Sequence, residues 1–149
     1  MTPDADPDCD FCGIVARQED AREVLRTDRV VAFFPIDPAT LGHTLLVPRR
    51  HLPDIWHLDH TTAAVLATAT LRVALAVRDA LQPDGLNIIQ SNGEAATQTV
   101  PHLHVHIVPR WDEDDMGPIW PDDTNFTQEQ MSVAQQRIQA RMGGGSEGR

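Results

Sequence analysis

The sequence lacks a hydrophobic run long enough to cross a membrane, and its first eight residues contain neither the basic nor the apolar part of a secretory signal. These absences favour a cytoplasmic protein with no membrane partner. Positive charge is also scarce: there is no lysine, and 12 arginines face 22 acidic residues, which gives a net charge of −10. This balance argues against a nucleic-acid-binding surface, which needs a basic stripe, but allows a locally positive pocket for a small phosphate ligand.

Cysteine is limited to two residues, Cys9 and Cys12, in a Cys-x-x-Cys arrangement. In a reducing cytosol this spacing is typical of a metal-binding or redox site rather than of a structural disulfide. The 149 residues, 41% hydrophobic and 23% charged, suit one globular domain with a hydrophobic core. We expect a disordered segment at residues 1–8, one domain at 9–142 with a variable C-terminal region from about residue 112, and a flexible tail at 143–149.

The order of the expected elements is strands, one long helix, then strands. We expect a short helix at 11–17, strands at 22–27, 29–36, 43–47 and 86–90, a helix that Asp59 caps and that runs to about Leu81, and a last helix near 127–142. Thr127 and Gln130 have the spacing of a capping box at the start of that last helix. The order predicts an α+β fold, an antiparallel sheet with the long helix packed on one face and short helices near both ends.

Residues 102–107 alternate three histidines with three aliphatic residues. Because successive side chains of a strand point to opposite faces, a strand here places Leu103, Val105 and Ile107 in the core. His102, His104 and His106 then form a row on the other face. Packing does not require three imidazoles in a row, whereas a reaction or a metal does. One hypothesis is a zinc-dependent hydrolase in which these three histidines bind one metal.

Together with Gly42-His43-Thr44-Leu45-Leu46-Val47-Pro48 and the Cys-x-x-Cys start, this segment resembles the histidine-triad (HIT) superfamily of nucleotide hydrolases and transferases, in its bacterial branch with Cys-x-x-Cys. The resemblance runs from about Cys9 to Trp111 and includes Asp37-Pro38, Asn92-Gly93 and Gln98-Thr99. It implies a HIT-like fold that acts on a small-molecule nucleotide and needs no organic cofactor.

The resemblance implies covalent catalysis at the α-phosphorus of the nucleotide. His104 would be the nucleophile, His43 would orient it, and His106 would contact the phosphate and assist the leaving group. The product would be a nucleoside monophosphate, released from a nucleotidyl-histidine intermediate. Polar ligands of the phosphate would come from Asn92, Gln98 and Thr99.

In bacterial relatives with Cys-x-x-Cys, a structural zinc ion is held by positions that match Cys9, Cys12, His51 and His102. Two cysteines and two histidines are a suitable tetrahedral zinc set. The alternative is a pair of free thiols without metal. The chain departs from a common pattern at Pro35, where many relatives have an Asp that binds the ribose; Asp37 could take its place.

The expected helix at 59–81 is apolar almost all round near its centre, which is typical of a helix buried on more than one side. The resemblance implies that this helix and a neighbouring strand form a homodimer. Two other functions stay open. One is a diadenosine polyphosphate hydrolase or phosphorylase, indicated faintly by Trp111 and residues 123–126; the other is a nucleotide-binding module with little turnover.

Overall fold

The computed structural model describes residues 4–143. Its contacts divide the chain into two compact units, Met1–Met116 and Gly117–Arg149. The expectations of disorder at residues 1–3 and of a flexible tail at 144–149 fall outside the described part. Residues 4–8 form turns, since the Asp8 amide donates to the Asp6 side chain and the Cys9 amide to the Asp6 carbonyl.

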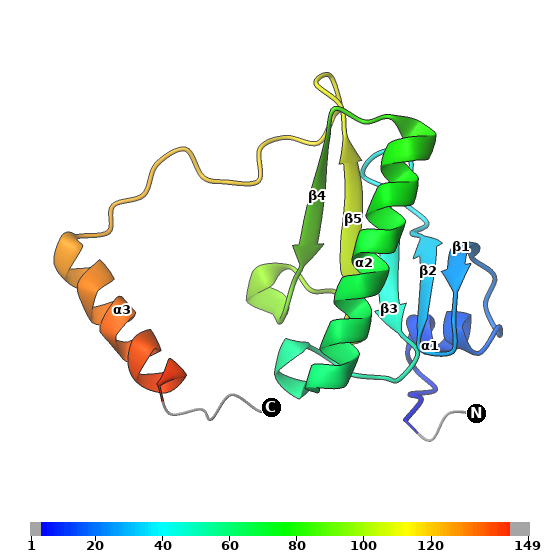
Figure 1. Cartoon of the computed structure of the whole chain (residues 1–149), viewed down its shortest axis with the longest axis horizontal. Coiled ribbons are helices and arrows are strands. Elements are labelled where there is room, and N and C mark those ends of the chain that lie inside the picture. The colour runs from blue at the N-terminus through cyan, green and yellow to red at the C-terminus, as the bar shows by residue number, and fades with distance from the viewer. Residues whose placement is uncertain (1–3, 144–149) are drawn as a thin grey trace. The chain divides into compact units, whose positions relative to one another are not determined.

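The first unit is built on one five-stranded antiparallel sheet (Figure 1), which confirms the α+β prediction. The spatial order of the strands is β1-β2-β3-β5-β4. Their bounds are β1 Arg22–Arg26, β2 Val30–Phe34, β3 Thr44–Pro48, β4 Gly85–Gln90 and β5 Val105–Arg110. The strands expected at 22–27, 29–36, 43–47 and 86–90 are therefore confirmed within one or two residues at each end.

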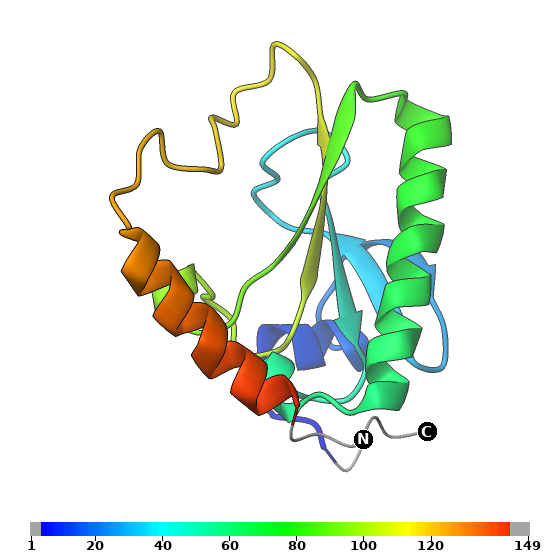
Figure 2. The same ribbon diagram turned by 60° about the vertical axis from the view of Figure 1, so that its left-hand side comes forward.

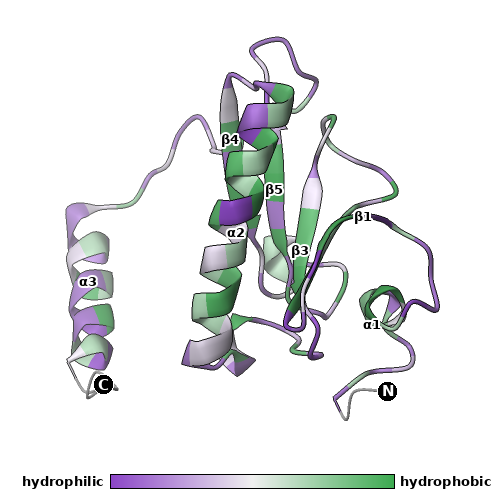
Figure 3. Ribbon diagram, turned by 45° about the vertical axis from the view of Figure 1, so that its right-hand side comes forward, coloured by the Kyte–Doolittle hydropathy of each residue, from purple (hydrophilic) through white to green (hydrophobic). Residues whose placement is uncertain are grey.

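The central strands are buried on both faces. In β2, Val30 and Ala32 belong to one hydrophobic cluster, whereas Val31 and Phe33 belong to the other. This separation follows from the alternation of side chains along a strand. Figure 3 shows that hydrophobic residues also occur along the central strands β3 and β5. The sheet thus has one core on each side.

The long helix α2 (His60–Leu81) covers one face of the sheet (Figure 2) and has the predicted cap, because the Asp59 carboxylate accepts from the Thr62 amide. The expectation that α2 is buried on more than one side is wrong for the single chain. Its buried residues form one stripe: Thr62, Leu66, Ala69, Val73 and Val77. A second apolar stripe is exposed to solvent: Ala64, Ala67, Leu71 and Leu75.

The other face of the sheet carries the N-terminal segment. Helix α1 (Asp10–Val15) packs Phe11 edge-on against Phe33, with ring centroids 5.4 Å apart. Short 3₁₀ helices at Ile55–His57 and Glu94–Ala96 lie in the connections before α2 and after β4. The N-terminal helix is thus confirmed, with an end two residues earlier than predicted.

The histidine segment only partly forms a strand. β5 begins at Val105, so His102 and His104 precede it, and the prediction of a regular strand through all three histidines is wrong. The register with β3 explains the boundary. Leu46 pairs with Val105, so Leu103 would face Pro48, which has no N–H to continue the ladder. The predicted faces nevertheless hold, because Leu103, Val105 and Ile107 all lie in the core beneath α2.

The second unit contains α3 (Gln128–Met142), which confirms the predicted last helix. The capping box is complete: Thr127 accepts from the Gln130 amide, and the Gln130 side chain accepts from the Thr127 amide. Within residues 4–143, no helix combines the length and the apolar character that a membrane crossing requires.

Candidate active site and metal site

The rings of His43, His104 and His106 line a pocket of about 910 Å³, a size typical of small-molecule sites. Apolar side chains of α1, of the end of β2 and of β3 also line it, together with charged residues. The apolar lining includes Phe11, Ile14, Phe33, Phe34, Ile36 and Leu45.

His104 is held by the backbone of its own segment. Its Nδ1 donates to the His102 carbonyl oxygen at 2.7 Å, and Phe11 packs edge-on against its ring at 5.2 Å. Because the proton of a neutral imidazole is then on Nδ1, Nε2 keeps its lone pair. Burial lowers the pKa of His104, which further favours the neutral ring. His104 therefore offers an unprotonated nitrogen next to the pocket, as a nucleophile requires.

His43 and His106 form a pair across the sheet. His106 pairs with Leu45 in the ladder between β3 and β5, and His43 lies two residues before Leu45 on the same face. His43 Nε2 and His106 Nδ1 are 2.9 Å apart. The direct partner of His43 is thus His106, whereas the expectation from the resemblance was that His43 orients His104.

A backbone amide sets the protons of this pair. The Ala39 N–H donates to His43 Nδ1 at 3.0 Å, so the proton of a neutral His43 is on Nε2. That Nε2–H donates to His106 Nδ1. The proton of His106 is consequently on Nε2, which can donate a hydrogen bond. The ring centroids of His106 and His104 are 4.9 Å apart.

The pKa values of His43 and His106 both lie below the ordinary histidine value. Burial, then the nearby His104, lowers the pKa of His43. Burial together with the rings of His104 and His43 lowers the pKa of His106 to about 4. Three neighbouring imidazoles cannot all be charged in such an enclosed place, so the neutral chain of hydrogen bonds is the form at pH 7.

The predicted phosphate and ribose ligands divide into two groups. Thr99 and Asp37 line the pocket. Asn92 and Gln98 lie outside its lining, and their amides hold the loop that follows β4. Asn92 accepts from the Ile55 amide, while Gln98 accepts from the Gly93 amide and donates to the Pro53 carbonyl. A role of all four on the substrate stays a prediction.

On the other side of Phe11, four side chains gather around one point. The ligand atoms of Cys9, Cys12, His51 and His102 all lie within 4.8 Å of one another, and within the described chain they form the one such group. Nδ1 of His102 lies 3.5 Å from Cys9 Sγ and 3.6 Å from Cys12 Sγ, and Nδ1 of His51 lies 3.4 Å from Cys12 Sγ. Tetrahedral zinc with ordinary bond lengths gives sulfur–nitrogen separations of about 3.6 Å. These residues could therefore bind a metal.

The outer nitrogens of the two histidines are placed as in a metal site. His102 Nε2 donates to the Pro48 carbonyl at 2.8 Å, and His51 Nε2 lies 3.9 Å from an Asp6 carboxylate oxygen. Such partners fix the ring that binds a metal and make it more basic. Without a cation, burial raises the pKa of the Cys12 thiol to about 11, so thiolate ligands here need a positive ion. This geometry uses His102 apart from the other two triad histidines, which argues against one metal shared by all three.

Three contributors to the sites have no signal in the sequence. The Ala39 amide and the carbonyls of Pro48 and His102 act through the backbone, and every residue has such groups. Phe11 also contributes, since it contacts the rings of both His102 and His104. It does have a sequence signal, because it is an aromatic residue between Cys9 and Cys12.

Comparison with known sequences identifies a family model and several relatives that match this chain. A family model described as "HIT domain" matches residues 16–113. "Protein hit" of Bacillus subtilis is 37% identical over 113 residues, which covers 75% of this chain and 78% of that protein. "Adenylylsulfatase HINT3" of Arabidopsis thaliana is 28% identical over 107 residues, which covers 72% of this chain and 54% of that protein.

Solved structures agree with the sequence matches. A crystal structure of a HIT-family member from Bacillus subtilis superposes with a TM-score of 0.83 at 33% identity, covering 90% of this chain and 96% of that one. A zinc-bound histidine triad family protein from Mycobacterium smegmatis gives a TM-score of 0.70 at 32% identity, covering 90% of this chain and 97% of that one. With the family model matching well over half of its length, the chain belongs to the HIT family.

Proposed function

We propose that this protein is a nucleotide hydrolase that cleaves at the α-phosphate through a nucleotidyl-histidine intermediate. The observation that carries the proposal is the fixed tautomer of His104, because its Nδ1–H is bound to the His102 carbonyl and leaves Nε2 free at the pocket. A neutral imidazole nitrogen can attack phosphorus and form a phosphoramidate bond.

In the first step a bond forms between His104 Nε2 and the α-phosphorus, and the bond from phosphorus to the leaving group breaks. The leaving group departs with the bonding electron pair and takes a proton from solvent. The Nε2–H of His106 donates to a phosphate oxygen or to the departing atom, where negative charge grows. The intermediate has a cationic His104 ring, with the proton on Nδ1 and phosphorus on Nε2. In the second step a water oxygen forms a bond to phosphorus while the phosphorus–nitrogen bond breaks and its electron pair returns to Nε2. One proton of the water passes to solvent, the nucleoside monophosphate leaves, and His104 is neutral again.

The cluster of two cysteines and two histidines suits a structural zinc ion that takes no part in this reaction. Cys9 and Cys12 would hold it together with His51 and His102, and the ion would supply cross-linking of the N-terminal segment to the core. A metal-bound rather than disulfide-bonded cysteine pair also fits the reducing cytoplasm. Elemental analysis of purified protein should find one zinc per chain; protein free of metal without any chelator treatment would contradict this part.

The test of the reaction is release of AMP from adenosine 5′-phosphoramidate by the wild-type protein and by His104→Ala. We expect the substitution to lower kcat/KM by about 10⁴-fold, as loss of a nucleophile does. His57→Ala is the matched control, because His57 is 61% exposed at its side chain and lies outside the pocket lining. Equal rates for wild type and His104→Ala would refute the mechanism.

Two further substrates distinguish the neighbouring functions. Diadenosine tetraphosphate tests the polyphosphate branch, and phosphate-dependent formation of nucleoside diphosphate would indicate a phosphorylase. Adenosine 5′-phosphosulfate tests the chemistry that the name of the Arabidopsis relative implies. Tight nucleotide binding with no product from any substrate would support a binding module and refute the hydrolase.

We also propose a homodimer. The exposed stripe of Leu71 and Leu75 on α2 and the exposed Ile88 on the edge strand β4 are apolar surface that a second copy could cover. Light scattering after gel filtration should give twice the 16.5 kDa chain mass at micromolar concentration. A monomer mass there, or a dimer that Leu71→Asp fails to weaken, would contradict the assignment of this surface.

A further inference from the structure

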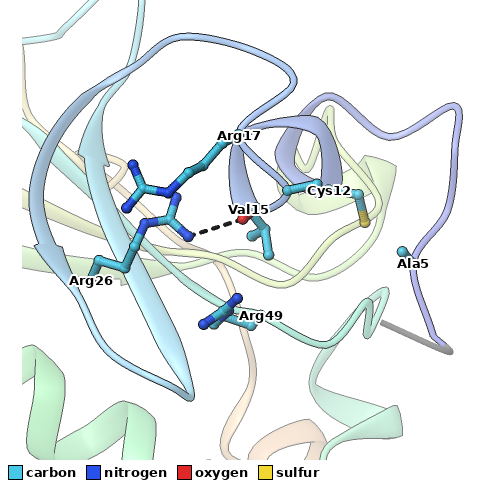
Figure 4. A pocket seen from close by; sticks show the side chains of 7 residues that line it. Ala5, Cys12, Val15, Arg17, Arg26 and Arg49 are labelled. Carbon is cyan, nitrogen blue, oxygen red and sulfur yellow. Dashed lines mark hydrogen bonds between the residues drawn. The ribbon is translucent and has the colours of Figure 1, made fainter. Parts of the chain in front are cut away.

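We propose that the chain has a second ligand site, a pocket for a tetrahedral phosphate-type oxyanion that three arginines line. Arg17, Arg26 and Arg49 meet at a cavity of about 540 Å³ beside the end of α1 (Figure 4), called the arginine pocket below. Their guanidinium groups gather on one side of α1, and the Cys12 sulfur points away from them. None of the three arginines lines the histidine pocket.

Arg26 is the fixed wall of the arginine pocket. Its guanidinium donates to the Val15 carbonyl at 2.9 Å and to the Ile14 carbonyl at 3.1 Å, which adds side-chain partners to the carbonyls at the end of α1. Its remaining side is bound by the Glu23 carboxylate, so its charge is balanced. The Arg26 guanidinium thus offsets the partial negative charge at the C-terminus of α1, and this charge would otherwise repel an anion in the cavity.

Arg17 and Arg49 have no direct ion-pair partner among the described residues. The nearest negative group is Glu23, whose carboxyl pKa is lowered by its hydrogen bond to Arg26 and, from further away, by the charge of Arg17. Among residues 4–143, neither guanidinium has a carboxylate oxygen within 4.0 Å. Arg49 uses one donor, to the Thr27 carbonyl at 3.2 Å, and within the described part of the chain the other side-chain donors of Arg17 and Arg49 have no protein acceptor. Two arginines in one cavity without a direct carboxylate contact among the described residues are unexpected in a chain of net charge −10, where acidic residues are abundant. An anionic ligand would balance them.

The backbone holds Arg17 in a conformation that glycine usually takes. The Arg17 amide donates to the Ile14 carbonyl, and the Gln18 amide donates to the Gly13 carbonyl, which is the hydrogen-bond pattern of a Schellman turn. Arg17 has a φ of 60°, in the left-handed region, where most turns of this kind have glycine. Gln82 after α2 and Thr97 have the same backbone region, so this conformation fixes the direction of the Arg17 side chain but does not by itself assign it a ligand.

The donors fit a phosphate group better than a single carboxylate. A guanidinium presents two parallel N–H groups, and two such forks from different segments can engage three or four oxygens of a tetrahedral anion. The cavity has room for inorganic phosphate or for the phosphate end of a small phosphorylated molecule. Both sources share the same chemistry, so the ligand is defined here by its phosphate group.

The experiment is a titration of metal-loaded, ¹⁵N-labelled protein with inorganic phosphate, followed by NMR. We expect saturable shifts of the Arg17 and Gln18 amides and of the Arg49 Nε–H signal. Arg17→Gly is the decisive variant, because glycine keeps the left-handed turn and removes the guanidinium. It should weaken binding by about tenfold, and adding Arg49→Gln should weaken it by about tenfold more. Arg137→Gln, on the exposed face of α3, is the control and should bind as wild type.

The outcomes separate this site from the histidine pocket. Shifts at these arginines that persist in His104→Ala, together with an equal response to sulfate and none to acetate, support the proposal whatever the catalytic activity. AMP as titrant shows whether a phosphate monoester binds as inorganic phosphate does. The proposal is overturned if no signal saturates, if only signals of the histidine pocket move, or if Arg17→Gly with Arg49→Gln binds phosphate as tightly as wild type.

Discussion

His102 and His104 are two residues apart in one short segment, yet their rings belong to different sites. His102 is fully enclosed and directs Nδ1 to two cysteines, while its Nε2 is bound to the Pro48 carbonyl. His104 is bound at Nδ1 to a carbonyl and keeps Nε2 open to the pocket. Which nitrogen the backbone occupies therefore decides which nitrogen each ring leaves available to a metal or to a substrate.

The comparison also separates stability from reactivity. In the proposed function the ring of His102 would contribute through an ion that ties residues 9–12 to the core, whereas the ring of His104 would contribute through a lone pair. Phe11 lies between the two, in edge-on contact with both rings. Substitutions in the cysteine–histidine cluster should therefore change the free energy of unfolding, whereas substitutions in the histidine pocket should change kcat.

The largest effect on stability is expected from Cys12→Ser. Loss of one thiolate ligand should release the metal and lower the free energy of unfolding by about 4 kcal/mol, since loss of a bound metal is among the most destabilising changes. Urea denaturation of wild type, of Cys12→Ser and of chelator-treated wild type measures this. If the three unfold at the same urea concentration, the metal side has no structural role.

On the reactive side, His106→Gln should lower kcat by about 10²-fold, because a donor to the phosphate or to the leaving group is lost while His104 stays in place. The reduction should be larger for poor leaving groups than for good ones. His60→Gln, at the exposed start of α2, is the control. A uniform rise in KM with unchanged kcat would instead assign His106 to ground-state binding.

The pH dependence of kcat/KM tests the low pKa values in the pocket. The neutral imidazoles are the active forms, so activity is retained at high pH and lost as the pH falls through their pKa values. Burial lowers the pKa of His43 and His104, and lowers that of His106 to about 4. The acid midpoint should thus lie below the ordinary histidine value of about 6.5, with about a tenfold loss per pH unit beneath it. A midpoint at or above 6.5 would contradict the enclosed pocket.

The smallest effect is expected at the pocket rim. Asp37 lines the pocket and is exposed, so Asp37→Ala should raise KM for a ribonucleotide substrate by about fivefold through the loss of one hydrogen bond. The matching 2′-deoxyribonucleotide serves as the control, since it lacks the hydroxyl in question. An unchanged KM for the ribonucleotide would remove Asp37 from the list of substrate ligands.

Much of the fold follows from local patterns. The Asp59 cap, the Thr127–Gln130 capping box and the alternation of residues 102–107 were sufficient to place α2, α3 and the buried face of the triad segment. The start of β5 was not predictable from propensity, because it depends on Pro48 of a strand far away in the sequence. Exposure of the second α2 stripe likewise depends on which surfaces the sheet covers.

For the cysteine–histidine cluster the member residues were predictable, whereas the contacts around the other histidines were not. Cys9, Cys12, His51 and His102 gather as the resemblance implied. The pairing of His43 with His106 and the tautomer of each ring depend on amides and carbonyls, which leave no mark in the sequence. Asn92 and Gln98 carry amides that suit a phosphate ligand and a loop equally well, and here they bind the loop.

Helix α1 has six residues and borders both cavities. Phe11 and Ile14 line the histidine pocket, while Cys12 and Val15 line the arginine pocket. Because the helix is so short, its few residues form part of the wall of both cavities. Any influence of bound oxyanion on nucleotide affinity must be matched by an equal influence of nucleotide on oxyanion affinity, because the coupling free energy belongs to the pair of sites.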